Sequence, residues 1–212
     1  MKIFNKNRLL ILILILTFIL TLSITYAKAV GNDIKSSFFR LHIVANSDLD
    51  KDQNLKLYVR DRILNDYGYL FENAVSSEDA AKIAAQNLDK IKETATLEIK
   101  KQGFDYEVTP LVGEFAFPTK SYGNITLPSG RYRALSIKIG EAKGQNWWCV
   151  MYPPLCLTDG ILLYNEQSND LIKNNLSKEE YNLITKTDTG ALPVEIRFKI
   201  VEVFQKLFSN QD

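Results

Sequence analysis

The most continuous apolar stretch of the chain lies at its start. A short segment with three basic residues precedes a run from Leu9 to Ile24 that only three hydroxyl residues interrupt. Small residues follow at Ala27 and Ala29. This order is typical of secretory signals, so we expect residues 1–29 to be a signal peptide cleaved before Val30. An uncleaved anchor is the alternative, because the run is long for a signal peptide, although its 16 or so residues fall short of the roughly 20 of a spanning helix.

Behind this segment the pattern changes from a strand to two helices. Residues 36–45 are aromatic and β-branched, which predicts a strand. Apolar residues then recur every fourth position, which predicts a helix that begins after Asn46-Ser47-Asp48 and stops at Gly68, and a second helix over residues 76–103. The apolar positions of these helices are Leu55, Val59, Ile63 and Tyr67, and then Ala84, Leu88, Ile91, Ala95 and Ile99.

The second half of the chain reads mainly as strands. Alternation predicts strands over residues 104–117 and 131–139, separated by a Gly-, Ser- and Thr-rich loop over residues 119–130. The apolar run 147–152 predicts a strand that is covered on both faces. Pro193 favours the first turn of a final helix. The order β-α-α-β-β-β-α predicts an α+β domain with a mostly antiparallel sheet, two central helices and a C-terminal helix.

Composition fits one domain of ordinary size over residues 30–212. The hydrophobic share of the chain is 46%, which is enough for a core. Residues 1–29 carry four basic residues and no acid, so their removal would change the formal net charge from +1 to −3. Nucleic acid and anionic lipid surfaces need clustered basic residues. We therefore expect no nucleic-acid partner, and membrane contact only through the signal peptide or a receptor.

The chain offers few residues for catalysis. His42 is the single histidine, so a histidine-rich metal site is excluded, and we expect no metal, no cofactor and no catalytic residue. A Cys149–His42 nucleophile has no support beyond the presence of both residues. Asp188-Thr189-Gly190-Ala191 matches the tetrapeptide of aspartic proteases. However, it follows polar residues instead of an apolar strand and has no second copy, so we expect Asp188 to be a capping or turn residue.

Cys149 and Cys156 are the only cysteines. The Pro153-Pro154 bend between them would bring the two sulfur atoms within disulfide reach, and an exported domain favours oxidation. The alternative is a pair of buried thiols that behave as small hydrophobic groups. The sequence leaves both open.

Two stretches are too particular to be generic: residues 40–48, RLHIVANSD, and residues 117–156, from FPTKSYGN to QNWWCVMYPPLC. Together with the signal segment and the terminal EIRFK helix, they resemble the stage II sporulation protein R family over nearly the whole chain. One departure is Ala142, in a turn where we expect a further glycine.

The resemblance implies a signalling role and no enzymatic activity. It implies export from the forespore to the space between two membranes, and activation there of a membrane-embedded aspartic protease of the mother cell, which processes the sigma-E precursor. An activator without chemistry acts through a surface. We expect receptor contacts from the 119–130 loop and from the first strand, namely Lys120, Tyr122 and Asn124, with Arg40, His42 and Asn46. The alternatives are an exported thiol or aspartyl hydrolase and a cell-envelope binding module.

Overall fold

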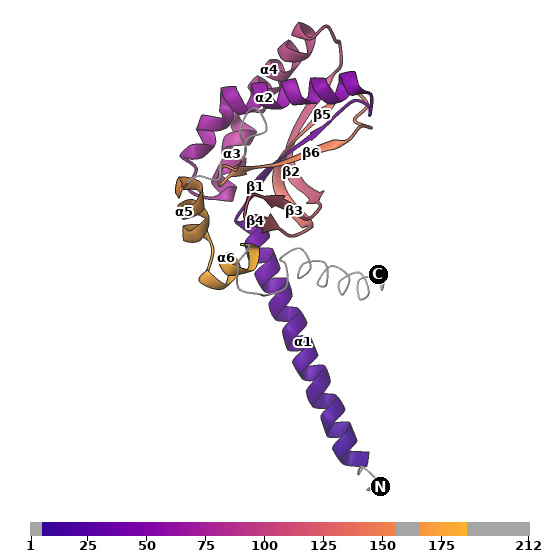
Figure 1. The fold of residues 1–212 in the computed structure, drawn as a ribbon, viewed down its shortest axis with the longest axis vertical. Coiled ribbons are helices and arrows are strands. Elements are labelled where there is room, and N and C mark those ends of the chain that lie inside the picture. Colours follow the sequence, from indigo (N-terminus) through magenta and orange to yellow (C-terminus); the bar gives the residue numbers. More distant parts are fainter. Residues whose placement is uncertain (1–5, 156–165, 186–212) are drawn as a thin grey trace.

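The computed structural model describes residues 6–155 and 166–185 (Figure 1). A long helix leads into a sheet that carries helices on one face, and a small hairpin and two short helices follow on the other. The elements are α1 (Lys6–Ser36), β1 (Phe39–Val44), α2 (Asp50–Glu72), α3 (Ser77–Gln86), α4 (Leu88–Lys101), β2 (Val108–Phe117), β3 (Lys120–Tyr122), β4 (Ile125–Leu127), β5 (Gly130–Ile139), β6 (Asn146–Tyr152), α5 (Glu166–Asn175) and α6 (Lys178–Ile184).

The main sheet has the strand order β2-β5-β1-β6. β1 pairs with β5 in parallel, whereas the β2–β5 and β1–β6 pairs are antiparallel. The remaining strands β3 and β4 form a separate antiparallel pair. The prediction of an α+β fold with a mostly antiparallel sheet is confirmed.

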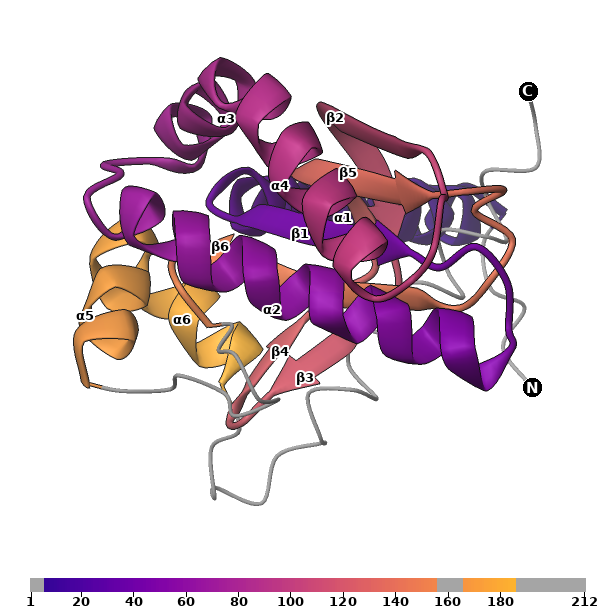
Figure 2. The ribbon, with the colours of Figure 1, turned by 90° about the horizontal axis from the view of Figure 1, so that it is seen from above.

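One face of the sheet is covered by α2, α3 and α4 (Figure 2). The odd-numbered residues of β1 point to this face because side chains alternate along a strand. They are Phe39, Leu41 and Ile43, and all three are fully buried. The predicted apolar stripes of the helices pack against them, with Leu55, Val59 and Ile63 buried and Tyr67 half-buried. The helical periodicity therefore identified this half of the core correctly.

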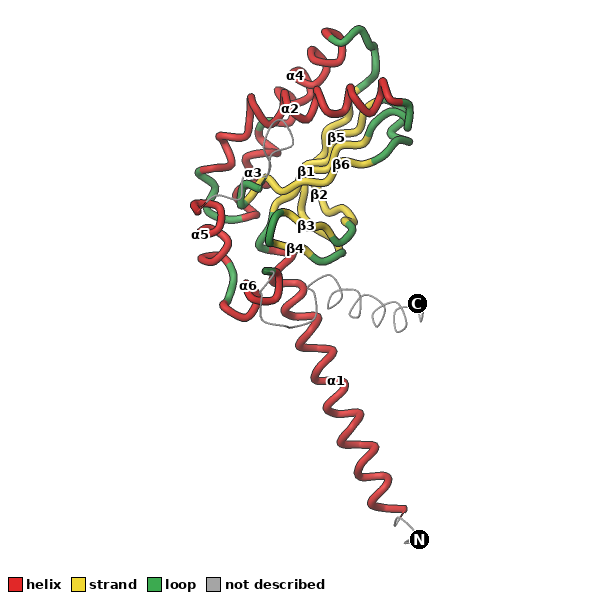
Figure 3. Tube along the Cα trace, viewed as in Figure 1, coloured by secondary structure: helices red, strands yellow, loops and turns green. Residues whose placement is uncertain are grey.

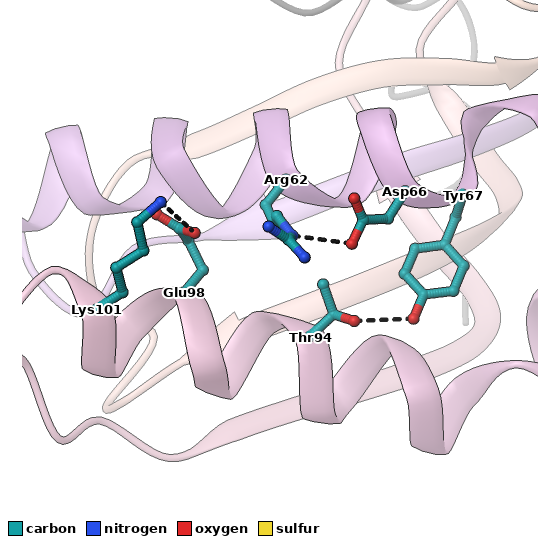
Figure 4. A network of polar contacts seen from close by, with 6 residues as sticks. All are labelled: Arg62, Asp66, Tyr67, Thr94, Glu98 and Lys101. Carbon is teal, nitrogen blue, oxygen red and sulfur yellow. Dashed lines mark hydrogen bonds and ion pairs between the residues drawn. The ribbon is translucent and has the colours of Figure 1, made fainter.

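Polar contacts join α2 to α4 above this layer (Figure 4). The Tyr67 hydroxyl lies 2.9 Å from that of Thr94, which links the two helices. The other pairs in this region stay within one helix: Arg62 donates to Asp66 at 2.8 Å, and Lys101 lies 3.7 Å from Glu98. Pairs three or four residues apart on one helix stabilise it by a few tenths of a kcal/mol, so we assign them a structural role.

The other face of the sheet has its own core at the end beside α1. Here the last turns of α1, the β3–β4 hairpin, α5 and α6 enclose a second cluster. Its buried members include Ile34, Phe38, Phe117, Tyr122, Ile125, Leu127, Tyr132, Val150, Ile172 and Ile184. We call this end of the sheet proximal, and the opposite end, where β1 and β5 finish, distal.

The predicted helix boundaries need two corrections. The helix predicted over residues 76–103 is two helices, because Asn87 ends α3 with its side chain donating to the Ile83 carbonyl at 2.8 Å. Asparagine competes in this way with the helical backbone pattern. The first helix does not stop at Gly68 but continues to Glu72, where the buried Phe71 stacks on Phe39 with 6.0 Å between ring centroids.

The predicted loop over residues 119–130 is wrong. These residues form the β3–β4 hairpin, which turns at Gly123 with φ 61°. Ile125 and Leu127 alternate toward the second cluster and are fully buried. Three-residue strands are too short for a clear alternation signal, and the content of glycine, serine and threonine outweighed it.

The N-terminal boundary also differs from expectation. α1 runs without a break through the predicted cleavage site after Ala29 and ends only at Ser36, so β1 starts at Phe39 rather than near residue 36. Cleavage before Val30 stays a prediction. Three predicted features lie outside the described residues. They are the final helix, which would start near Pro193, the turn residue Asp188, and Cys156.

Candidate functional site

The six predicted receptor-binding residues fall at the two ends of the sheet. Arg40 and Tyr122 meet at the proximal end, and His42 lies next to Arg40 on the same face of β1. Lys120 and Asn124 belong to the hairpin, where Lys120 is exposed and Asn124 is half-buried. Asn46 stands apart from all of them, at the distal end of β1. The structure therefore brings together two of the six side chains by a direct hydrogen bond.

Arg40 is completely buried, and three aromatic rings surround it. Its guanidinium carbon lies 4.0 Å from the centroid of Phe117, 4.7 Å from that of Tyr132 and 5.7 Å from that of Tyr122. A guanidinium is attracted to the faces of aromatic rings, and most strongly where water is absent. We call Phe117, Tyr122 and Tyr132 the aromatic cage.

Two hydrogen bonds hold the guanidinium inside the cage. Nη2 of Arg40 donates to the Tyr122 hydroxyl at 2.5 Å, and Nε donates to the Cys149 carbonyl at 3.4 Å. The Tyr122 hydroxyl in turn donates to the Trp148 carbonyl at 3.2 Å. Burial raises the pKa of Tyr122, while the charge of Arg40 opposes that rise. The phenol thus stays neutral and can bridge the cation to the backbone of β6.

The charge of Arg40 has no carboxylate beside it within residues 6–155 and 166–185. None of the ion pairs there includes Arg40, and its Nη1 is buried without a hydrogen-bond partner. A buried cation normally pairs with an acid, since desolvation is expensive. Here the ring faces and the Tyr122 hydroxyl take that role.

His42 is held as a neutral ring beside the cage. It stacks on Trp148 with 4.1 Å between centroids, and its Nε2 lies 2.7 Å from Asn146 Oδ1. Burial lowers the pKa of His42, the charges of Lys138 and Arg40 lower it further, and only the Asn146 hydrogen bond raises it. A neutral imidazole that stacks on Trp148 and contacts Asn146 in this way contributes to the packing of β1 against β6.

Asn46 belongs to a half-buried polar cluster at the distal end. The centre of the cluster is the carboxylate of Asp52, which is 1% exposed. It accepts hydrogen bonds from Asn46 at 2.8 Å, Ser47 at 2.6 Å and Tyr106 at 3.1 Å. Burial alone would raise the pKa of Asp52, but the three donors and the charge of Lys51 together outweigh burial, and the pKa lies below its ordinary value. We call Asn46, Ser47, Asp52 and Tyr106 the distal lock.

Asn46-Ser47-Asp48, after which the sequence predicts the start of the helix, do not cap it. The N-cap position of α2 is Leu49, and no side chain caps it. Instead the Asn46 side chain reaches across to the β5–β6 turn, where its Oδ1 accepts the Glu141 amide at 2.9 Å. The helix-start signal thus located the helix but not the partners of its polar residues.

The β5–β6 turn, residues 140–145, is tied to the β1–α2 loop through its backbone; we call it the tip turn. Besides Glu141, three further amides of the turn donate to that loop. They are Lys143 to the Asn46 carbonyl at 3.1 Å, Gly144 to the Ala45 carbonyl at 3.0 Å and Gln145 to Asp48 Oδ1 at 2.8 Å. The turn is therefore fixed by its neighbour and not only by its own sequence.

Close approach explains the glycines of the tip turn. A Cβ on Gly144 would lie 2.2 Å from the Ser47 carbonyl oxygen, and one on Gly140 would lie 2.2 Å from Asn46 Oδ1. Ala142 has a φ of 52°, in the left-handed region that favours glycine. The expectation of a glycine at position 142 was therefore conformationally sound, and this chain places an alanine in a strained position.

Sequence reasoning missed Asp52 and Tyr106. Asp52 lies one helical turn before Leu55 on the buried face of α2, which is an unusual place for an acid. An acid in register with an apolar stripe is the signal that would have found it. Tyr106 is separated from Asp52 by 54 residues, and no local pattern connects them.

Cys149 is disulfide-bonded. Cys156, the partner predicted from the sequence, lies outside the described residues, so that pairing stays a prediction. A sulfur in a disulfide is not a free thiolate, which removes support from Cys149 as a nucleophile. Within the described part of the chain, no group of three His, Cys, Asp or Glu side chains is placed to hold a metal ion.

Comparison with known proteins places the chain in one family, and the matched residues include both ends of the sheet. Residues 35–161 match the family Stage II sporulation protein R (spore_II_R). Stage II sporulation protein R of Bacillus subtilis (strain 168) is 32% identical over 187 residues, which cover 83% of this chain and 84% of the relative. The chain belongs to this family. No solved structure gives a significant match.

Membership of this family supports a role in sporulation. The matched region starts at the end of α1 and includes the aromatic cage, His42, the distal lock and the tip turn. α1 itself fits a signal peptide or a membrane anchor, since it is long and apolar enough to cross a bilayer. The large apolar side chains of α1 between Leu9 and Leu22 are 44–67% exposed, so the domain does not cover them.

Proposed function

We propose that the protein is an exported sporulation signal. It leaves the forespore, enters the space between the two membranes and activates a membrane-embedded aspartic protease of the mother cell, which then processes the sigma-E precursor. The observation that carries this proposal is the family match over residues 35–161. The apolar helix α1 supports it, because a basic start followed by an apolar segment leaves the rest of the chain outside the membrane.

An activator of this kind works by selective binding. A partner changes the balance between an inactive and an active protease only to the extent that it binds the active form more tightly. Moving a receptor from about 1% to about 99% active requires roughly 10⁴-fold tighter binding to the active form. The exported domain therefore needs a rigid surface of defined shape, and it needs no catalytic group of its own.

The test is reconstitution in a host that lacks both partners. The full chain is co-expressed with the candidate membrane protease and the sigma-E precursor, and precursor cleavage is followed by immunoblot. We expect cleavage only when the chain is exported. Deletion of residues 1–29 should abolish cleavage, although it leaves Ile34 and Phe38, which the second cluster needs.

The matched control restores export with an unrelated signal peptide fused before Val30. Cleavage should return with it. Cleavage without the chain, or undiminished cleavage by the cytoplasmic form, would contradict the proposed function. An envelope-binding module predicts a different result: the purified protein would sediment with cell-wall material and would leave the precursor intact.

A further inference from the structure

The tip turn lies at the end of the domain farthest from α1. β5 begins at Gly130, which packs against the side chain of Lys35 in the last turn of α1. β5 then runs ten residues to Ile139, which is about 30 Å at the rise of an extended strand. The tip turn follows directly, and Figure 3 shows the loops at this end of the sheet, away from α1.

α1 joins the domain without a flexible linker. Only Ser37 and Phe38 separate the helix from β1. Ile34 and Phe38 are 0% and 1% exposed within the second cluster, and the Ser36 carbonyl accepts a hydrogen bond from the Ser77 hydroxyl. While α1 lies in a bilayer, the proximal end of the sheet is held near the membrane and the tip turn points away from it (Figure 1).

The tip turn presents an acid and a base on a fixed backbone. Glu141 and Lys143 form an ion pair of 2.8 Å, and their side chains are 68% and 75% exposed. Such exposed pairs add little to folding stability. The four turn amides bonded to the β1–α2 loop nevertheless hold this pair in place. A rigid turn that shows two opposite charges is suited to binding, because no ordering is needed and charges select the partner.

We propose that the tip turn, through Glu141 and Lys143, is the surface that contacts the receptor. The partner is an extracytoplasmic segment of a membrane protein on the facing membrane, and it carries a base opposite Glu141 and an acid opposite Lys143. This inference rests on the proposed function for the position of the receptor, and on retention of α1, the alternative to cleavage before Val30, for the orientation of the domain. It assigns the contact to the distal end rather than to the hairpin residues Lys120, Tyr122 and Asn124.

The test exchanges the two charges. The variant Glu141→Lys with Lys143→Glu keeps an ion pair and the net charge but reverses the pattern that a partner meets. We expect at least about a tenfold loss of precursor cleavage in the reconstituted system, because like charges facing each other would disfavour binding by more than about 1.4 kcal/mol.

The matched control is the same exchange at an exposed pair of the proximal half. Glu78 and Lys82 on α3 lie 3.2 Å apart, with side chains 65% and 66% exposed. The variant Glu78→Lys with Lys82→Glu should cleave the precursor as the unmodified chain does. Equal activity of the two exchanged variants would overturn the assignment of the tip turn, whereas an inactive unmodified chain would overturn the proposed function instead.

Cross-linking keeps the proposal testable if the exchanged chain is poorly exported. A photo-reactive amino acid replaces Glu141 in one full-length chain and Glu78 in another, with all other residues unchanged. Position 141 should cross-link to the protease and position 78 should not. Cross-linking from position 78 alone, or equally from both, would contradict a contact at the tip turn.

Discussion

Two buried charges of opposite sign lie at opposite ends of the sheet, and they are stabilised in different ways. Arg40 at the proximal end is 0% exposed and is held by ring faces and two hydrogen bonds. Asp52 at the distal end is 1% exposed and is held by three donors. They do not pair with each other.

The difference shows what each end is built to fix. Ring faces attract a cation over a broad range of positions, so the aromatic cage is part of the packing of the second cluster. Hydrogen bonds to a carboxylate are directional, so the distal lock specifies the path of two loops. We therefore expect the stability of the protein to depend more on close backbone contacts at the distal end than at the proximal end.

The largest effect is expected from Gly144→Ala. The new Cβ would meet the Ser47 carbonyl oxygen at 2.2 Å, and backbone cannot move aside as a flexible side chain can. We expect the free energy of unfolding to fall by about 3 kcal/mol. Urea denaturation followed by circular dichroism measures it.

Gly68→Ala is the control for that variant. A Cβ at Gly68 meets nothing within 4 Å and lies inside α2, so this change should stabilise the protein by about 1 kcal/mol. If both alanine variants had the same stability, the close packing of the tip turn against the β1–α2 loop would be refuted.

Tyr122→Phe tests the proximal end. It keeps the ring of the aromatic cage but removes the hydroxyl that accepts from Arg40 Nη2. Nη2 would then lack a hydrogen-bond partner, as Nη1 already does. Hydrogen bonds to charged groups contribute roughly 1.5–3 kcal/mol, and we expect a loss of about 2 kcal/mol in denaturant titration. Tyr58→Phe, at a side chain that is 51% exposed, should change stability by less than about 0.5 kcal/mol. A harmless Tyr122→Phe would mean that the rings and the Cys149 carbonyl hold the cation without the hydroxyl.

Ala142→Gly should stabilise the protein through the tip turn. The φ of 52° is costly for alanine and free for glycine, although glycine loses more backbone entropy on folding. The balance predicts a gain of about 0.5–1 kcal/mol, visible as a higher midpoint of thermal unfolding. A loss of stability would show that the turn does not keep its left-handed residue in solution.

The smallest effect concerns pH. The pKa of His42 is lowered in the folded protein, so the unfolded chain takes up a proton first on acidification. This contribution to stability is complete above about pH 6.5 and is lost as the pH falls toward the folded pKa. Asp52 follows the same direction but only below about pH 4, because its folded pKa lies below the ordinary value. Unfolding midpoints at pH 7.5 and pH 5 should differ less in His42→Gln than in the unmodified protein; an identical difference would exclude His42 as the cause.

The sequence predicted the helix-covered half of the fold well, because its apolar residues follow long, regular periods. It predicted the opposite face of the sheet less well. The β3–β4 hairpin is too short for periodicity to show. In the helix-covered half, the one missed feature is the break at Asn87, which depends on a side chain that bonds to its own helix.

The candidate residues show the same limit. Arg40 and His42 lie in the strand that the sequence predicts, and they share one of its faces because alternation is a local property. That Tyr122 is buried against Arg40, from 82 residues away, follows from tertiary packing that no local pattern contains. The receptor-binding roles of Lys120, Tyr122, Asn124, Arg40, His42 and Asn46 stay predictions. Burial makes Arg40 and Tyr122 suited to shaping a surface rather than forming it.

The two-residue junction between α1 and β1 has a consequence for how far the uncleaved protein can reach. A flexible linker would let the domain take up many positions and distances relative to the bilayer. Without one, the domain reaches only as far as its own length allows. If the proposed receptor lies on an opposing bilayer, its engagement by the uncleaved protein would depend steeply on the distance between the two bilayers.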